Sequence, residues 1–220
     1  AAAFLCELLG LRQDQLPTTA QLAAKYPCGD PLNLSPEMCD PTTIPRGDEH
    51  IDGMPTTTNG VPNGRVLNFA LLVGFALDDT GARPGGGNLG VLPGSHFALA
   101  QAFRAYTASV QRESKNEDPV NAFLGEKTNG SPSERLRAVL KRTGTSWKQF
   151  LEAHPPQPVL LRTGDAVIAH FQTVHFVYHN TSLTSRKMLY FRIMPPNRID
   201  WKNNNPKALV EPFAEFVGMS

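Results

Sequence analysis

Residues 159–194 read VLLRTGDAVIAHFQTVHFVYHNTSLTSRKMLYFRIM, and this stretch decides the fold. It is rich in the β-branched and aromatic residues that strands favour, and turn residues such as Gly164-Asp165 divide it. The pattern predicts four strands in succession, at 159–162, 166–171, 173–180 and 187–194. Pro195-Pro196 ends the last strand, because proline cannot donate to a sheet ladder.

Two further strands are expected upstream, separated from this stretch by helices. Residues 65–77 (RVLNFALLVGFAL) form an apolar run that predicts a buried strand, and residues 89–92 predict a short one. Helices are expected at 97–106, 132–142 and 146–154. Strands on both sides of a helical insertion, without regular strand–helix alternation, indicate a mainly β chain folded as an antiparallel sandwich or jelly roll.

The length of 220 residues suits one domain, and we expect its core at about 44–194 with a helical insertion at about 97–154. The N-terminal part is expected to form helices within residues 1–25. The first would end at Gly10, and Thr18 or Thr19 would cap the second, which would run through Lys25.

The charge balance argues against nucleic acid or an anionic membrane as a partner, and the cysteine count favours a reducing compartment. Lys plus Arg number 21 and Asp plus Glu number 20, so no global field attracts nucleic acid or an anionic membrane. No apolar run approaches the roughly 20 residues needed to span a bilayer. A pairing of Cys28 with Cys39 stays open, but three cysteines favour reduced thiols. With no visible secretion signal or peroxisomal address, an intracellular, cytoplasmic protein is expected.

His50-Ile51-Asp52 is the first candidate for chemistry. In an extended segment, residues two apart point the same way, so this imidazole and carboxylate can reach one metal ion together. Two histidines and one carboxylate on one face of an ion are diagnostic of non-haem Fe(II) oxygenases. On its own, however, the pair is better explained as a loop histidine beside a solvated carboxylate.

Three histidines compete to be the third ligand: His170, His175 and His179. His175 and His179 share a face of a regular strand, so strand parity does not choose between them.

Several motifs together resemble the phytanoyl-CoA dioxygenase family of 2-oxoglutarate oxygenases. They are the H-x-D pair, the stretch ending Pro93-Gly-Ser-His96, the Gly164-Asp165 turn, and the strand that runs into Asn180-Thr-Ser182 and Arg186. The resemblance covers about residues 48–194. It implies a double-stranded β-helix (cupin-like jelly roll) with flanking helices, and it selects His175 as the distal iron ligand.

The resemblance also implies Fe(II) and 2-oxoglutarate as cofactors, with ascorbate as a reductant, and a small organic substrate with dioxygen. Arg186 would hold the far carboxylate of 2-oxoglutarate, for which its planar fork is suited. Ser182 is a candidate to orient the cofactor, and the alternative is that it only forms hydrogen bonds within a turn. Asn68 interrupts an apolar strand, and its side chain is expected either to line the pocket or to lie on a solvent-exposed face. Asp52 stands where related halogenases have a small residue, which favours hydroxylation.

Two other functions are compatible with the same residues. One is a jelly-roll protein without redox activity that binds a structural metal or another ligand. The other is a metal-dependent isomerase or hydrolase on a cupin-like barrel, which would not need Arg186.

Overall fold

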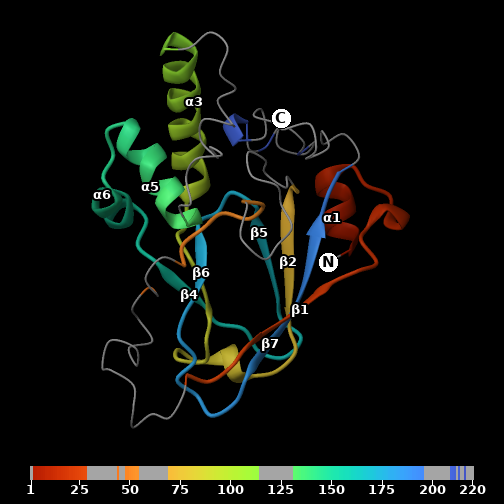
Figure 1. The fold of residues 1–220 in the computed structure, drawn as a ribbon. Coiled ribbons are helices and arrows are strands. Elements are labelled where there is room, and N and C mark those ends of the chain that lie inside the picture. The colour runs from red at the N-terminus through yellow and green to blue at the C-terminus, as the bar shows by residue number, and fades with distance from the viewer. Residues whose placement is uncertain are drawn as a thin grey trace.

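The structure is a computed structural model that describes residues 2–28, 44, 48–54, 69–113, 131–195, 209–211, 213 and 216. Strands β1, β7, β2 and β5 form a four-stranded antiparallel sheet in that order, and β4, β3 and β6 form a three-stranded one. The two sheets face each other as the walls of a barrel (Figure 1). The strand bounds are β1 Gln21–Lys25, β2 Leu71–Ala76, β3 Leu89–Val91, β4 Gln157–Val159, β5 Ala166–His170, β6 His175–Val177 and β7 Arg186–Ile193.

An isolated bridge widens the smaller sheet. His50 lies between β1 and β2 in the chain, and it pairs antiparallel with His175 of β6. If His50 is counted as a strand position, the chain has eight positions in the order β1, His50, β2, β3, β4, β5, β6 and β7. In this numbering the larger sheet has the order first, eighth, third, sixth. The smaller sheet has the order second, seventh, fourth, fifth. This is the pairing of a jelly roll, so the predicted mainly β fold with flanking helices is confirmed.

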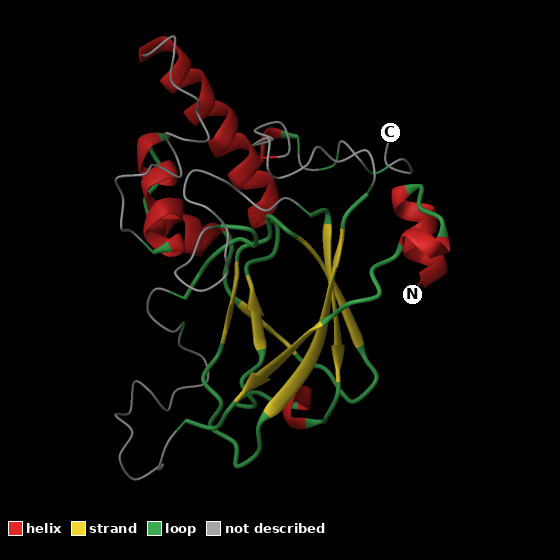
Figure 2. Cartoon of the chain, turned by 45° about the vertical axis from the view of Figure 1, so that its right-hand side comes forward, coloured by secondary structure: helices red, strands yellow, loops and turns green. Residues whose placement is uncertain are grey.

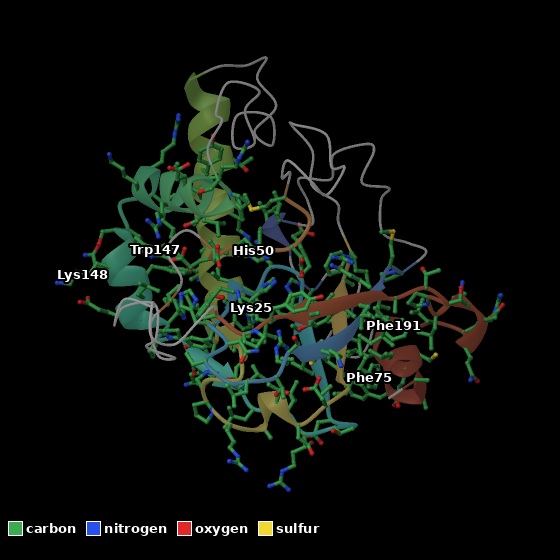
Figure 3. All side chains as sticks on the ribbon, turned by 60° about the horizontal axis from the view of Figure 1, so that its bottom comes forward. Lys25, His50, Phe75, Trp147, Lys148 and Phe191 are labelled. Carbon is green, nitrogen blue, oxygen red and sulfur yellow. The ribbon has the colours of Figure 1, made fainter. Side chains whose placement is uncertain are left out.

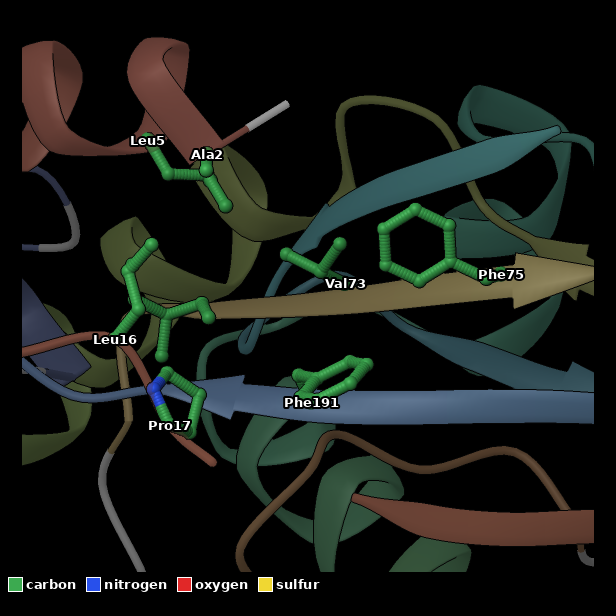
Figure 4. Close-up of a pocket in the computed structure, with 8 residues that line it drawn as sticks. Ala2, Leu5, Leu16, Pro17, Val73, Phe75 and Phe191 are labelled. Carbon is green, nitrogen blue, oxygen red and sulfur yellow. The ribbon is translucent and has the colours of Figure 1, made fainter. Parts of the chain in front are cut away.

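Alternation along β7 separates two apolar regions. Met188 and Tyr190 point into the barrel and belong to the main core, whereas Ile193 belongs to a second cluster outside it. The outer cluster packs the larger sheet against α1 (Ala2–Leu9), which buries Leu5 and Leu9 there. Figure 4 shows this contact, with Leu5 and Leu16 to the left of Val73, Phe75 and Phe191 of the sheet. The protein thus has two separate apolar clusters, one inside the barrel and one between the outer face of the larger sheet and α1.

Three helices of the described residues lie between β3 and β4 in the chain. Helices α3 (Ser95–Glu113), α5 (Pro132–Arg142) and α6 (Trp147–Ala153) lie together on one side of the molecule, and α1 lies on the other side (Figures 1 and 2). Ser131 and Ser146 begin α5 and α6 as N-caps in complete capping boxes. Short 3-10 turns occur at Gln13–Gln15 (η1) and Thr80–Ala82 (η2). Among the helices of the described residues, none combines the length and apolar character needed to cross a membrane.

The second N-terminal helix was a wrong prediction. Residues Gln21–Lys25 form the edge strand β1, each in register with a residue of β7 from Tyr190 to Arg186. The five residues have no strong strand propensity, so pairing with the long neighbouring strand overrides local preference. Neither Thr18 nor Thr19 caps a helix.

Several element boundaries also differ from the predicted ones. The strand expected at 159–162 begins at Gln157 and ends at Val159, and the strand expected at 173–180 is limited to His175–Val177. The helix expected at 97–106 begins at Ser95 and extends to Glu113. The Ser95 hydroxyl accepts a hydrogen bond from the Val174 amide, which ties α3 to the smaller sheet.

Asn68 and Cys39 lie outside the described residues, and Cys6 and Cys28 are free thiols.

Gly90 tests how tightly the smaller sheet is packed. A Cβ at this position would overlap the Phe176 ring, which is fully buried on the neighbouring strand. We expect Gly90→Ala to lower the free energy of unfolding by about 2 kcal/mol, measured by urea denaturation, because overpacking strains the core. Phe176→Leu in the same chain should recover part of this loss. Strictly additive effects of the two substitutions would contradict the proposed overlap.

Candidate metal centre

The backbone brings the predicted ligands together. His50 and His175 exchange two hydrogen bonds, each from the amide of one to the carbonyl of the other at 3.0 Å. The Asp52 amide donates to the Phe171 carbonyl at 3.1 Å, which fixes the next turn of the same segment. As a result, one potential ligand atom from each of His50, Asp52 and His175 lies within 4.8 Å of the other two. Among the described residues this is the one group of three that could hold a metal ion.

Hydrogen bonds to the backbone fix which ring nitrogen of each histidine is free. His50 Nδ1 lies 2.7 Å from the Asp48 carbonyl oxygen, and His175 Nδ1 lies 2.9 Å from that of Thr173. A carbonyl oxygen only accepts, so both Nδ1 atoms carry a proton, and the neutral form of each ring has its lone pair on Nε2. Metal-bound histidines in proteins have this arrangement, with the second ring N–H donated to a carbonyl or carboxylate.

Asp52 supplies the negative charge. Its Oδ2 atom is buried, lies 3.6 Å from His175 Nε2, and has no hydrogen-bond partner among the described residues. A buried carboxylate oxygen without a partner is costly, because its solvation by water is lost and nothing replaces it. A cation held between this oxygen and the two Nε2 atoms would supply the missing interaction.

The electrostatics keep His50 neutral. Burial in the barrel, followed by the adjacent His175, lowers the pKa of His50 to about 4. The ring centroids of the two histidines are 4.4 Å apart, so a second positive charge there would be repelled. Because a metal competes with protons for Nε2, a low pKa keeps His50 ready to bind a metal below neutral pH.

This pKa predicts how the stability of the metal-free protein depends on pH. Unfolded His50 has an ordinary pKa near 6.5, so between pH 6.5 and about 4 the unfolded chain binds the proton and the folded chain does not. Acidification across this window should therefore cost up to about 3 kcal/mol of unfolding free energy. Urea denaturation at several pH values measures it, and His50→Asn should flatten the slope. An equally steep slope in that variant would assign the loss to other groups.

The two competing histidines lie elsewhere. His179 follows the end of β6, and its Nδ1 lies 3.6 Å from Cys28 Sγ. The His170 ring contacts Phe213 and Phe216 beside the outer face of the larger sheet. Neither joins the three-residue group.

Arg186 begins β7 with its side chain on the same face as Met188, inside the barrel. It is 4% exposed, and a Cβ on Gly81 would stand 3.2 Å from its Cδ, so glycine leaves room for this side chain. Its Nε is buried and has no hydrogen-bond partner among the described residues. An anion in the barrel would meet an available cation here.

Ser182 has the contacts of the turn-forming alternative. Its amide and hydroxyl both donate to Asn180 Oδ1, at 3.0 and 2.6 Å, and its hydroxyl also lies 2.9 Å from the Thr184 carbonyl. Asn180 Nδ2 donates to the carbonyls of Lys25 and Thr184, both at 2.8 Å. These bonds shape the turn that leads into β7, and so they fix the position of Arg186, the first residue of that strand. A direct contact of Ser182 with a cofactor stays a prediction, as does any role of Asn68.

Known proteins resemble this chain only distantly. No family model matches it, and no curated protein matches it. Among solved structures, SnoK is described as a non-heme alpha ketoglutarate dependent carbocyclase from nogalamycin biosynthesis. It is 19% identical over 80% of this chain and 51% of its own, with a TM-score of 0.40.

Two further solved structures are similar to a comparable degree. AviO1 from Streptomyces viridochromogenes Tue57 is 16% identical over 89% of this chain and 57% of its own, with a TM-score of 0.40. EvdO2 from Micromonospora carbonacea var. aurantiaca, solved with 2-oxoglutarate, is 17% identical over 96% and 62%, with a TM-score of 0.41. The chain thus spans 51–62% of the length of these proteins. Similarity at this level does not transfer an activity.

Two residues of the site were missed by sequence reasoning. Lys25 of β1 is the register partner of Arg186, and its side chain runs beside Gly87 and Asn180 toward the smaller sheet. Glu49, next to the first histidine, is buried against α5. Figure 3 shows Lys25 and His50 near the centre of the molecule, with Trp147 on the side of the helical insertion. Only tertiary pairing reveals either residue, because nothing in their local sequence marks them.

Proposed function

We propose that this chain is a 2-oxoglutarate-dependent non-haem iron dioxygenase that hydroxylates a small organic molecule. One observation carries the proposal. Two histidines and the Asp52 carboxylate converge on one point, and the same barrel holds the buried Arg186, whose Nε has no hydrogen-bond partner among the described residues. A metal alone would explain the first three residues, and an anionic ligand is needed to explain the fourth.

The donor set fits ferrous iron. His50 and His175 would each bind through Nε2, and Asp52 would bind through the buried Oδ2. Two histidines and one carboxylate on one face of an ion leave coordination positions free for other ligands, which is typical of non-haem Fe(II) oxygenases. A structural metal site would more often be closed by four protein ligands.

The cations of the barrel fit a dicarboxylate. Arg186 and Lys25 stand opposite each other on neighbouring strands, where two like charges destabilise a sheet unless an anion lies between or near them. Formal charges at the centre also sum to zero: +2 for iron, −1 for Asp52, −2 for 2-oxoglutarate and +1 for Arg186. The nearby Asp48 interacts electrostatically with Lys25 and offsets its charge. A neutral total suits a buried site.

The bound iron and 2-oxoglutarate would together supply the activation of dioxygen, and the residues of the chain hold and shelter them. Asp52 and the two histidines would hold the ion, and Arg186 would bind the far carboxylate of the co-substrate. Ile51, Phe171 and Val174 are fully buried around the ligand segments and exclude water from that side. A dry site strengthens each of these electrostatic contacts.

Substrate-independent turnover tests the proposal. The protein incubated with Fe(II), ascorbate and 2-oxoglutarate in air should form succinate slowly without any added substrate. Protein with Asp52→Ala, or protein under argon, should form none above background. If the wild type forms no succinate but still binds Fe(II), it is a metal-binding jelly roll without redox activity. A metal-dependent isomerase or hydrolase would keep its activity in Arg186→Ala.

The membership in the phytanoyl-CoA dioxygenase family remains part of this proposal, supported by the motif order around His50, His175 and Arg186. Hydroxylation is favoured because a carboxylate occupies position 52, where a halide would otherwise need space. A screen of small metabolites for stimulation of succinate formation would identify the substrate.

A further inference from the structure

We infer that Glu49 is a positioning residue that couples the helical insertion to the metal ligands. It lies directly before His50, yet its carboxylate contacts α5 and not the metal centre. Where it concerns the metal, this inference rests on the proposed function. The contact itself is independent of any bound ion.

The contact is built from buried polar groups. Glu49 is 3% exposed, and its Oε2 accepts a hydrogen bond from the Ser133 hydroxyl at 2.9 Å. Its Oε1 accepts one from Arg137 Nη2 at 3.1 Å. Ser133 and Arg137 are four residues apart on α5, so they stand one turn apart on the same helix face. Both carboxylate oxygens of Glu49 are therefore held by one helix.

A second helix supports the same contact. The guanidinium carbon of Arg137 lies 5.1 Å from the centre of the Trp147 ring, which belongs to α6. A cation over an indole face is attracted to it, and this limits the rotamers open to Arg137. The chain of contacts thus runs from Trp147 through Arg137 and Glu49 to His50.

Backbone geometry explains why this contact bears on the metal. Successive side chains of an extended segment point to opposite sides, so Glu49 faces the insertion while His50 and Asp52 face the barrel interior. On the interior side, segment 48–54 is held to β6 by the amide and carbonyl of His50, and to the Phe171 carbonyl just after β5 by the amide of Asp52. Glu49 holds the same segment from the other side. Loss of either attachment lets the two ligands on this segment move together.

Stability alone does not account for a buried charge at this place. Replacing a buried ion pair with apolar side chains of similar size is often neutral or stabilising. A carboxylate gripped by two donors supplies a fixed register between α5 and the ligand segment, which an apolar contact would not. The insertion would then affect metal affinity although it contributes no ligand.

Two measurements test this inference with Glu49→Met, Ser133→Ala and the double variant. The control is Glu152→Gln, an exposed glutamate on α6 whose one ion pair among the described residues is with Lys148. In metal-free protein, amide hydrogen exchange at positions 50 and 52 should be at least tenfold faster in Glu49→Met than in the wild type or the control. Co(II) titration, followed by visible absorption, should show roughly tenfold weaker binding, as expected when a residue behind the ligands is lost.

The Ser133→Ala variant carries the sharper test, because Ser133 is remote from the metal and the change is small. It should shift exchange and Co(II) affinity in the same direction, and the double variant should be no worse than Glu49→Met alone. Exchange and affinity within twofold of wild type in both single variants would overturn the inference, even if their melting temperatures fall. If the wild type binds no Co(II), the proposed function fails, and hydrogen exchange still decides whether Glu49 holds the segment.

Discussion

His175→Ala should abolish tight binding of Fe(II) or Co(II), with an increase in Kd of at least about a hundredfold, and should stop succinate formation. The loss is large because one of three protein ligands disappears and the remaining two stand on a single segment. A structural role alone predicts a smaller effect, because the backbone bridge between positions 50 and 175 does not depend on the imidazole. Isothermal titration calorimetry under anaerobic conditions measures the affinity.

His179→Ala is the matched control, four residues further along the chain. Its ring lies beside Cys28 and outside the ligand group, so metal affinity and turnover should stay within about twofold of wild type. The opposite pattern, with His179→Ala inactive and His175→Ala active, would mean that the metal is held by a different set of residues.

Arg186→Ala should weaken the binding of 2-oxoglutarate by about a hundredfold or more and leave Fe(II) affinity nearly unchanged. Removal of one partner from a buried, hydrogen-bonded charge pair costs about 2–5 kcal/mol, and 1.4 kcal/mol corresponds to a factor of ten. Arg186→Lys should recover only part of the affinity, because an ammonium group does not offer the planar fork. The concentration of 2-oxoglutarate at half-maximal succinate formation gives the readout.

The adjacent Lys187 provides the control for charge. It points away from the barrel, is exposed, and its backbone amide donates to Asp78. Lys187→Ala removes the same net charge, so an equal rise in the 2-oxoglutarate requirement would assign the effect to long-range electrostatics. Unchanged 2-oxoglutarate dependence in Arg186→Ala would remove the co-substrate from the proposal and favour the isomerase or hydrolase alternative.

Much of the fold was predictable because its strands are punctuated in the sequence. Gly164-Asp165 and Pro195-Pro196 separate apolar runs, and the predicted helix at 132–142 coincides with α5. The N-terminal strand was missed because its five residues carry little strand propensity, and only the register with β7 makes them a strand. Short edge strands of this kind depend on a neighbour that lies far away in sequence.

The ligand group was predictable in part. The spacing of His50 and Asp52 indicated a shared direction, but strand parity left His175 and His179 equivalent. Tertiary structure separates them, because β6 ends at Val177 and the backbone beyond it pairs with other segments. Glu49 and Lys25 could not be foreseen, since their importance lies in contacts with α5 and β7.

The single bridge at His50 has a consequence for the protein when it lacks metal. Among the described residues, His50 occupies the outermost position of the smaller sheet, next to β6, and one pair of backbone hydrogen bonds joins it to that strand. An ion bound by the side chains of His50, Asp52 and His175 would join the segment to β6 a second time. Without the ion, detachment of the segment would leave the N–H and C=O groups of β6 unpaired, and such a border recruits strands from other molecules. Chelation should therefore promote self-association, with the rate rising with protein concentration.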